Sequence, residues 1–310
     1  MAARPIRIGT RGSQLARWQA NWVAAALTAA DPTRTAELVI IKTKGDRILD
    51  VPLARVGGKG LFVKEIEAAV GDGRADLAVH SMKDMPADLP DGLIIGAVPQ
   101  RETAGDVLIS RTGAGLADLP PGAVVGTSSL RRAAQIRHRR PDLTVISIRG
   151  NLDTRLKKLD AGEVDATVLA AAGVRRLGME ARITEHLDEE TMLPAVGQGA
   201  LCVEIRRDDP IIGPLAAALD HADSRLAVTA ERAFLHRLEG SCQVPVAGRA
   251  RIDGDTLILT GLVAELDGST VFKDVETGSV DAPEIIGQNL ADRLIGRGAG
   301  DVLARLKASA

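Results

Sequence analysis

Segments with strand and helix patterns alternate through the first two-thirds of the chain, and this alternation limits its fold more than any other feature. Such alternation is typical of a parallel α/β sheet. The pattern also repeats, because residues 6–16 resemble 123–133 and residues 71–79 resemble 161–169. In the second pair, Gly73, Asp76 and Val79 match Gly162, Asp165 and Val168. We therefore predict two similar α/β lobes, residues 1–99 plus 200–218 and residues 100–199, whose strand ends form a ligand cleft.

The pattern changes from about residue 219. Residues 224–240 predict an amphipathic helix, and three alternating segments between 246 and 276 predict an antiparallel sheet with turns at Asp253-Gly254 and Asp267-Gly268. A last helix is expected over about 282–307. Residues 219–310 should therefore form a small α+β domain.

Composition excludes several classes of function. The formal net charge is −2 and aromatic residues make up 2% of the 310 residues, which argues against nucleic-acid and membrane binding. Two cysteines forty residues apart do not indicate a disulfide scaffold, and we assign no metal site. The first residues lack the apolar core of a signal peptide, and no window is long enough to span a bilayer. We expect a cytoplasmic protein.

The motif VHSMKDMP at 79–86 is the strongest functional signal. The alternating run at 75–81 predicts a strand that delivers Lys83 and Asp84 into a loop, and Pro86 favours an extended Met85. Ligand chemistry in α/β folds is found at the carboxyl ends of strands. A solvated turn is the alternative, but several anion-binding features recur at similar junctions.

The motif GTSSLRR at 126–132 is one of these features. It places Thr127, Ser128 and Ser129 between a strand and a helix, with Arg131 and Arg132 in the first turn of that helix. A serine N-cap explains one hydroxyl, but cations are unfavourable at this end of a helix dipole. Anion binding therefore explains the pattern better.

Further basic residues follow other strands. Arg11 and Ser13 repeat the arrangement in GTRGSQLA. Lys59 lies in a glycine-rich loop that lacks the spacing of a P-loop, and a flexible loop without a ligand explains this segment equally well. Arg149, Arg155 and Arg176 follow strands of the second lobe. The predicted cleft is therefore cationic, and its ligand should carry many carboxylates or phosphates.

The two cysteines differ. Cys202 lies in an apolar strand and is expected to be a core thiol. Cys242 follows a predicted helix C-terminus in GSCQVP, where the helix dipole disfavours a thiolate. From the residues alone, an ordinary loop cysteine is the better interpretation, and a single covalent attachment stays open.

Together the motifs GTRGSQLA, GGKGLF, VHSMKDMP, GTSSLRR, IRGN, LPAVGQGAL and CQVP, in this order, resemble the porphobilinogen deaminase (hydroxymethylbilane synthase) family over essentially the whole chain. The resemblance implies two lobes similar to type II periplasmic binding proteins and a third domain. It implies head-to-tail condensation of four porphobilinogen molecules on a covalently bound dipyrromethane cofactor, with release of ammonia, in tetrapyrrole biosynthesis. The sequence does not specify an oligomeric state, and since nothing in it demands more than a monomer, we expect a monomer.

The resemblance also implies roles for single residues. It places the thioether to dipyrromethane on Cys242 and gives Asp84 the stabilisation of positive charge on pyrrole nitrogens. Carboxylates of the cofactor would be bound by Lys83, Thr127, Ser128, Ser129, Arg131, Arg132, Arg155 and Gln198. Those of the substrate would be bound by Arg11, Ser13, Arg149, Arg155 and Arg176, and Lys59 would lie on a flexible loop.

Two other functions are weaker candidates. A two-lobed module that binds a polyanion without catalysis explains the repeat but not the Lys83-Asp84 loop or Cys242. Phosphate-dependent transfer would use the glycine-rich loop, whose spacing is wrong for it.

Overall fold

The computed structural model describes residues 4–47, 60–238 and 244–308, which belong to two compact units. Among the described residues, unit 1 consists of 4–47, 60–102 and 200–225, and unit 2 consists of 103–199, 226–238 and 244–308. No helix among the described residues is both long and apolar enough to cross a membrane.

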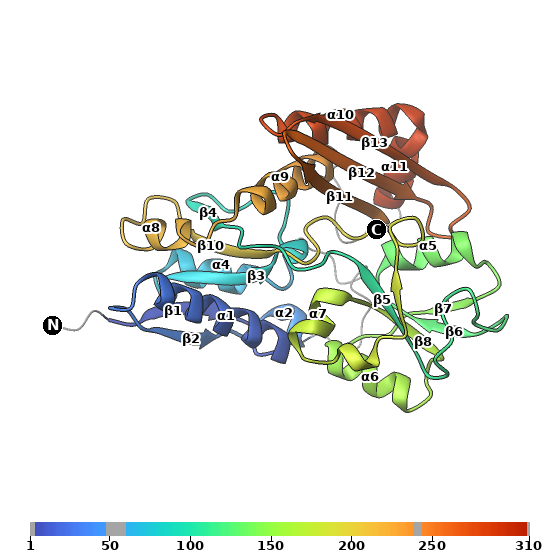
Figure 1. Cartoon of the computed structure of the whole chain (residues 1–310), viewed down its shortest axis with the longest axis horizontal. Helices are drawn as coiled ribbons and strands as arrows, with labels where there is room; N and C mark the ends of the chain where they lie inside the picture. Colours follow the sequence, from blue (N-terminus) through green and yellow to red (C-terminus); the bar gives the residue numbers. More distant parts are fainter. Residues whose placement is uncertain (1–3, 48–59, 239–243, 309–310) are drawn as a thin grey trace. The chain divides into compact units, whose positions relative to one another are not determined.

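Unit 1 is an α/β lobe, called lobe 1 below, built on a sheet with the strand order β2-β1-β3-β10-β4 (Figure 1). Only β10 runs antiparallel to its neighbours within this sheet. The strands are β1 Ile6–Thr10, β2 Ala36–Ile40, β3 Leu77–Ser81, β4 Leu93–Ala97 and β10 Leu201–Arg206. The helices are α1 Gln14–Ala30, α2 Lys44–Arg47, α4 Lys64–Gly71, the short η1 Met82–Asp84 and α8 Ile212–Ala217. Ile8, Leu77 and Val203 from three strands are fully buried in its core.

Unit 2 contains a second α/β lobe, called lobe 2, with the strand order β7-β6-β8-β5-β9 (Figure 1). Here β5 is the strand that runs antiparallel to its neighbours. The strands are β5 Asp106–Ser110, β6 Val124–Gly126, β7 Thr144–Ile146, β8 Ala166–Ala170 and β9 Glu185–Leu187. The helices are α5 Leu130–Arg139, α6 Leu152–Asp160, α7 Ala171–Arg176 and the short η2 Glu180–Arg182. Each sheet thus takes its antiparallel strand from the chain that has just left the other sheet, which confirms the two similar lobes.

The sequence repeat has a structural counterpart in both lobes. Gly73 follows α4 and Gly162 follows α6, and both adopt a positive φ, of 79° and 77°, which favours glycine. Asp76 and Asp165 then each exchange hydrogen bonds with the first parallel strand of their own sheet. The backbone N–H of Asp76 donates to Arg7 and its carboxylate accepts from the N–H of Arg7. Asp165 does the same with Val124.

The rest of unit 2 is the predicted α+β domain. Its antiparallel sheet has the order β11-β12-β13, and α10 packs against β12 and β13 (Figure 1). Both predicted turns are confirmed, with Gly254 and Gly268 at φ of 57° and 76°. The bounds are β11 Val246–Asp253, β12 Thr256–Ala264, β13 Val271–Ser279, α9 Ala222–Arg237, α10 Pro283–Leu294, η3 Ile295–Ala299 and α11 Gly300–Ala308.

The structure corrects three predicted elements. The last helix is not continuous over 282–307, because a π-type turn with Gly298 at φ 112° separates α10 from α11. The helix predicted over 224–240 begins earlier, at Ala222, and its regular part ends at Arg237. The run VIIKTKGD also predicts a strand over 39–46, but β2 ends at Ile40 and the short helix α2 follows it. The domain boundaries stay a prediction, because unit 2 holds lobe 2 and the α+β domain together.

Candidate functional site

Asp84 lies on a short 3-10 turn at the carboxyl end of β3. Buried Met82 and Met85 anchor the turn, and the N–H of Met82 donates to the carbonyl of Ala200 at 3.0 Å. Met85 is extended, with φ −72° and ψ 138°, as predicted from Pro86. Asp84 and Lys83 are half-buried, and the Asp84 carboxylate has no hydrogen bond or ion pair within the described part of the chain. It is therefore available to a ligand.

Arg11 follows β1, the parallel neighbour of β3, and emerges from the same edge of the sheet as Asp84. Its Nη2 and Nε donate to Asp46 at 2.5 and 3.1 Å, and its guanidinium lies 4.2 Å from the centre of the Phe62 ring. Burial would raise the pKa of Asp46, but the hydrogen bonds and charge of Arg11 outweigh it and lower the pKa. Ser13 is the N-cap of α1 and accepts the N–H of Ala16 at 3.3 Å.

In lobe 2, the loop between β6 and α5 carries the three predicted hydroxyl groups. Buried Thr127 accepts the N–H of Ser129 at 3.2 Å, and Ser129 is the N-cap that accepts the N–H of Arg132 at 3.4 Å. Ser128 is half-buried between them. A hydroxyl that accepts a hydrogen bond can still donate its own proton, so these groups suit a carboxylate ligand at a helix N-terminus.

Arg131 and Arg132 are buried and share Asp106, the first residue of β5. Nη1 of Arg131 donates to Asp106 at 2.8 Å and to the carbonyl of Leu193 at 2.7 Å. Arg132 donates to Asp106 through Nη2 and Nε at 2.7 and 3.2 Å. Burial alone would raise the pKa of Asp106, but the charges of the two arginines outweigh it and hold the pKa well below its ordinary value. The carboxylate is therefore ionised at neutral pH.

The remaining predicted residues of lobe 2 also make internal contacts. Nε of Arg155 donates to the carbonyl of Gly150 at 3.0 Å, and Nη2 of Arg176 donates to the carbonyl of Gly199 at 2.8 Å. Half-buried Arg149 follows β7. Gln198 is fully buried, and its amide donates to Asp106 at 2.9 Å and to the carbonyl of Ala104 at 2.7 Å.

The sequence alone did not indicate two acidic residues of the site, Asp46 and Asp106, which are partners of the predicted arginines. Since β5 is antiparallel, its first residue lies at the edge where the parallel strands end, next to Ala170 at the end of β8. Two arginines in a buried first turn require a carboxylate, and that requirement was the available signal. Lys59 and Cys242 lie outside the described residues. The direct ligand contacts assigned to each residue stay predictions.

The cluster around Arg131 fits an anionic group. Two guanidinium groups and one carboxylate leave one positive charge in a buried place. Within the described chain, Nε of Arg131 is buried without a hydrogen-bond partner. A buried N–H without an acceptor is unfavourable, and a ligand carboxylate would supply both an acceptor and the missing charge. The carboxylate side chains of a dipyrromethane have this chemistry.

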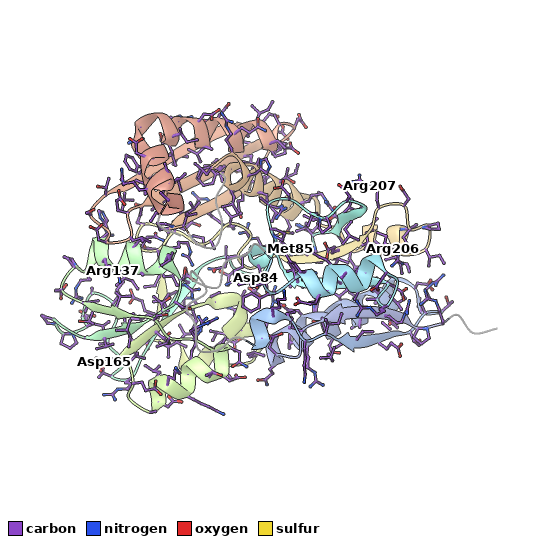
Figure 2. All side chains as sticks on the ribbon, turned by 180° about the vertical axis from the view of Figure 1, so that it is seen from behind. Asp84, Met85, Arg137, Asp165, Arg206 and Arg207 are labelled. Carbon is purple, nitrogen blue, oxygen red and sulfur yellow. The ribbon has the colours of Figure 1, made fainter. Side chains whose placement is uncertain are left out.

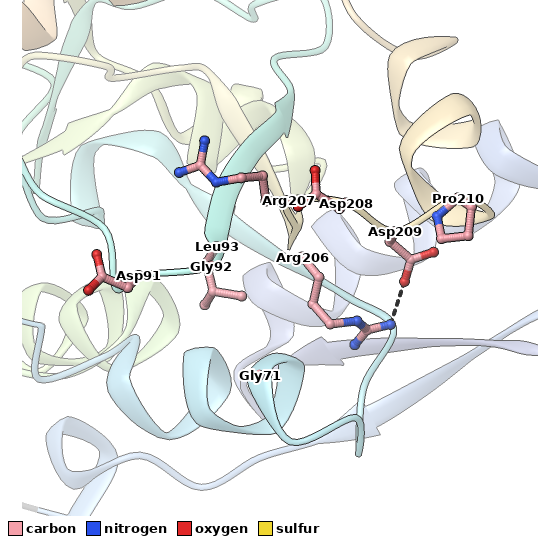
Figure 3. Close-up of a pocket in the computed structure, with 9 residues that line it drawn as sticks. All are labelled: Gly71, Asp91, Gly92, Leu93, Arg206, Arg207, Asp208, Asp209 and Pro210. Atoms are coloured by element: carbon pink, nitrogen blue, oxygen red, sulfur yellow. Dashed lines mark hydrogen bonds and ion pairs between the residues drawn. The ribbon is translucent and has the colours of Figure 1, made fainter.

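A pocket of about 490 Å³ lies elsewhere in lobe 1 (Figure 3). It is lined by Leu93 at the start of β4 and Arg206 at the end of β10, the sheet edge opposite to Asp84 (Figure 2). Arg206 donates to Asp209 at 2.6 Å and to the carbonyl of Val70 at 2.7 Å. Its charge is therefore satisfied within the protein, and we assign no function to this pocket.

Comparison with known proteins gives a consistent result. A family model described as "Porphobilinogen deaminase, dipyromethane cofactor binding domain" matches residues 6–213, and one described as "Porphobilinogen deaminase, C-terminal domain" matches residues 225–296. The porphobilinogen deaminase of Pelobacter propionicus is 52% identical over 98% of this chain and 97% of that protein. The porphobilinogen deaminase of Syntrophotalea carbinolica is 53% identical over 99% of this chain and 97% of that protein.

Among solved structures, an arginine-specific periplasmic binding protein of Salmonella typhimurium is similar at 15% identity and a TM-score of 0.40. The alignment covers 70% of this chain and 92% of that one. The two family models together cover nearly the whole sequence, and the curated relatives match it almost from end to end. The chain belongs to the porphobilinogen deaminase family.

Proposed function

We propose that this chain joins four porphobilinogen molecules head to tail on a dipyrromethane held by Cys242, releases ammonia at each addition and yields hydroxymethylbilane. The observation that carries this proposal is the match of both family domains, including the cofactor-binding domain, to residues 6–213 and 225–296. The substrate is accordingly porphobilinogen, and the product enters tetrapyrrole biosynthesis. We further propose that the chain acts as a cytoplasmic monomer.

Asp84 is the proposed catalytic residue. Pyrrole nitrogens acquire positive charge when the carbon–nitrogen bond to the leaving ammonia breaks and when the next ring is attacked. A fixed carboxylate near them stabilises that charge and can accept a proton. The half-buried Asp84 suits this role because the turn that carries it is anchored by two buried methionines, so its backbone is positioned before substrate binds.

The arginines are the proposed carboxylate-binding groups. Dipyrromethane, when bound, supplies the ring whose free α-carbon is extended. Arg131, Arg132 and Thr127 would hold its acetate and propionate groups, and Arg149 and Arg176 would orient the incoming substrate. Guanidinium groups bind carboxylates with two parallel hydrogen bonds, which fixes direction as well as position.

The test combines turnover with the intact mass of the chain. In Asp84→Asn, porphobilinogen consumption should fall by about 100-fold or more, as for other lost electrostatic stabilisers, while the covalent adduct remains. The matched control is Asp91→Asn, an exposed carboxylate at the opposite edge of lobe 1, which should keep wild-type turnover. Wild-type turnover in Asp84→Asn would refute the assigned role. A wild-type chain without adduct or turnover would refute the function.

A further inference from the structure

Asp106 and Gln198 form a second layer behind the two arginines of lobe 2. The side chain of Asp106 is fully buried, and each of its oxygens accepts from a different arginine. Gln198 donates to the oxygen that also binds Arg132. Asp106 is thus held from three directions, and it in turn fixes the planes of both guanidinium groups.

Gln198 is itself rigidly held. The glycines on either side of it have φ of 70° and 88°, a conformation that other residues rarely adopt. The N–H of Gly197 donates to the buried Glu231 at 2.7 Å, and the carbonyl of Gly199 accepts from Arg176. In this backbone conformation the amide of Gln198 donates to Asp106 and to the carbonyl of Ala104.

Asp106 also sets the net charge of the cluster that it forms with Arg131 and Arg132. Without Asp106 the arginine pair would carry two buried positive charges that repel each other and are costly to desolvate. With Asp106 the cluster carries one positive charge, and Nε of Arg131 is the buried N–H without a partner in the described part of the chain. This arrangement matches a single ligand carboxylate.

We propose that Asp106 and Gln198 are positioning residues that hold Arg131 and Arg132 as a preformed receptor for one carboxylate group of the bound oligopyrrole. The proposal rests on the proposed function, which supplies that ligand. Neither residue needs to touch the ligand, since each acts through the guanidinium groups. Gln198 accordingly serves as a support for the arginines and not as a direct cofactor contact.

A purely structural ion pair is the competing explanation, and the chain offers a matched control for it. Asp76 in lobe 1 has the same exposed fraction as Asp106, 1%, and also accepts from two arginines, Arg4 at 2.7 Å and Arg7 at 3.0 Å, which are themselves more exposed than Arg131 and Arg132. It lies at the edge of its sheet opposite to Asp84. Asp76→Asn should therefore weaken folding but leave ligand binding unchanged.

The experiment compares Asp106→Asn, Gln198→Leu and Asp76→Asn in the full chain. Intact mass gives the fraction of purified chains that carry the adduct, steady-state kinetics with porphobilinogen gives KM and kcat, and thermal unfolding gives stability. For Asp106→Asn and Gln198→Leu we expect the adduct-bearing fraction to fall to less than half, or KM to rise about tenfold with a smaller change in kcat. A binding group displaced from its productive position weakens ligand binding by at least this factor. Asp76→Asn should match the wild type in its adduct-bearing fraction and in KM.

Gln198→Leu removes no charge, so it keeps the test decisive if Asp106→Asn fails to fold. Wild-type adduct fraction and KM in Gln198→Leu would overturn the proposal, as would equal effects of Asp106→Asn and Asp76→Asn. Absence of adduct and turnover from the wild type would instead refute the proposed function on which the proposal depends.

Discussion

Replacing Glu67 by glutamine should change how the stability of lobe 1 depends on pH. Glu67 lies on α4 and is only 6% exposed. It shares the interior of the lobe with the buried pair of His80 and Glu204, whose Nε2 and Oε2 atoms are 3.1 Å apart. One oxygen of Glu67 and one of Glu204 are buried without a hydrogen-bond donor among the described residues. Ionised Glu67 is therefore poorly solvated.

Burial and the negative charge of Glu204 raise the pKa of Glu67 to about 7, against smaller lowering effects of His80 and Lys64. The group contributes its full stability below its ordinary pKa, where it is protonated in both states. This contribution is lost as pH rises from about 4.5 through about 7, because the unfolded chain ionises this carboxyl over that range while the folded protein keeps it protonated. A shift of this size corresponds to at most about 3 kcal/mol of the free energy of unfolding.

Urea unfolding at intervals between pH 5 and 9 measures this effect. The free energy of unfolding of the wild type should fall by up to about 3 kcal/mol more than that of Glu67→Gln across this range, because glutamine does not ionise. Ala68→Gln adds the same amide to the exposed face of α4 and should follow the wild type. Parallel pH profiles for the wild type and Glu67→Gln would refute the reasoning.

Three further predictions concern stability. Burial would raise the pKa of Asp76, but hydrogen bonds from Arg4 and Arg7 outweigh it and lower the pKa, so its stabilisation exists above the ordinary aspartate pKa and is lost on acidification. On acidification the free energy of unfolding should therefore fall less in Asp76→Asn than in the wild type, and an equal fall would contradict this. Ser129→Ala should cost about 1 kcal/mol in urea unfolding, since it removes the N-cap of α5, and no loss would contradict the cap. Gly287→Ala should cost about 1–3 kcal/mol, because its Cβ would lie 2.3 Å from the carbonyl of Ala230; a neutral result would mean that α10 moves freely from α9.

The fold could be predicted from the sequence where local pattern and topology coincide. The repeat of Gly73 and Asp76 at Gly162 and Asp165 indicated two similar lobes, and the structure shows the same turn and the same aspartate hydrogen bonds in each. The break near Gly298 was missed although Gly296 and Gly300 flank it, because glycine in a helical pattern can be tolerated and packing decides whether the helix continues.

The sequence indicated the cations of the candidate site, the hydroxyl groups at 127–129 and Asp84, whose strands and turns are encoded locally. Asp106 was not identified because its sequence neighbours show nothing of its partners. Arg131 is 25 residues and Gln198 is 92 residues away along the chain. Pairing at that distance depends on the antiparallel insertion of β5, which the alternation of strands and helices does not specify. The same holds for Asp46 and Arg11, which are 35 residues apart.

The central claim is that Cys242 holds a dipyrromethane on which the chain builds its product. The most direct measurement is the intact mass of the purified wild-type chain beside Cys242→Ser, both incubated with porphobilinogen. The wild type should carry an adduct of two pyrrole units and gain further units during turnover, and Cys242→Ser should carry none. A wild-type mass equal to that of the bare polypeptide, or an adduct that persists in Cys242→Ser, would contradict the account.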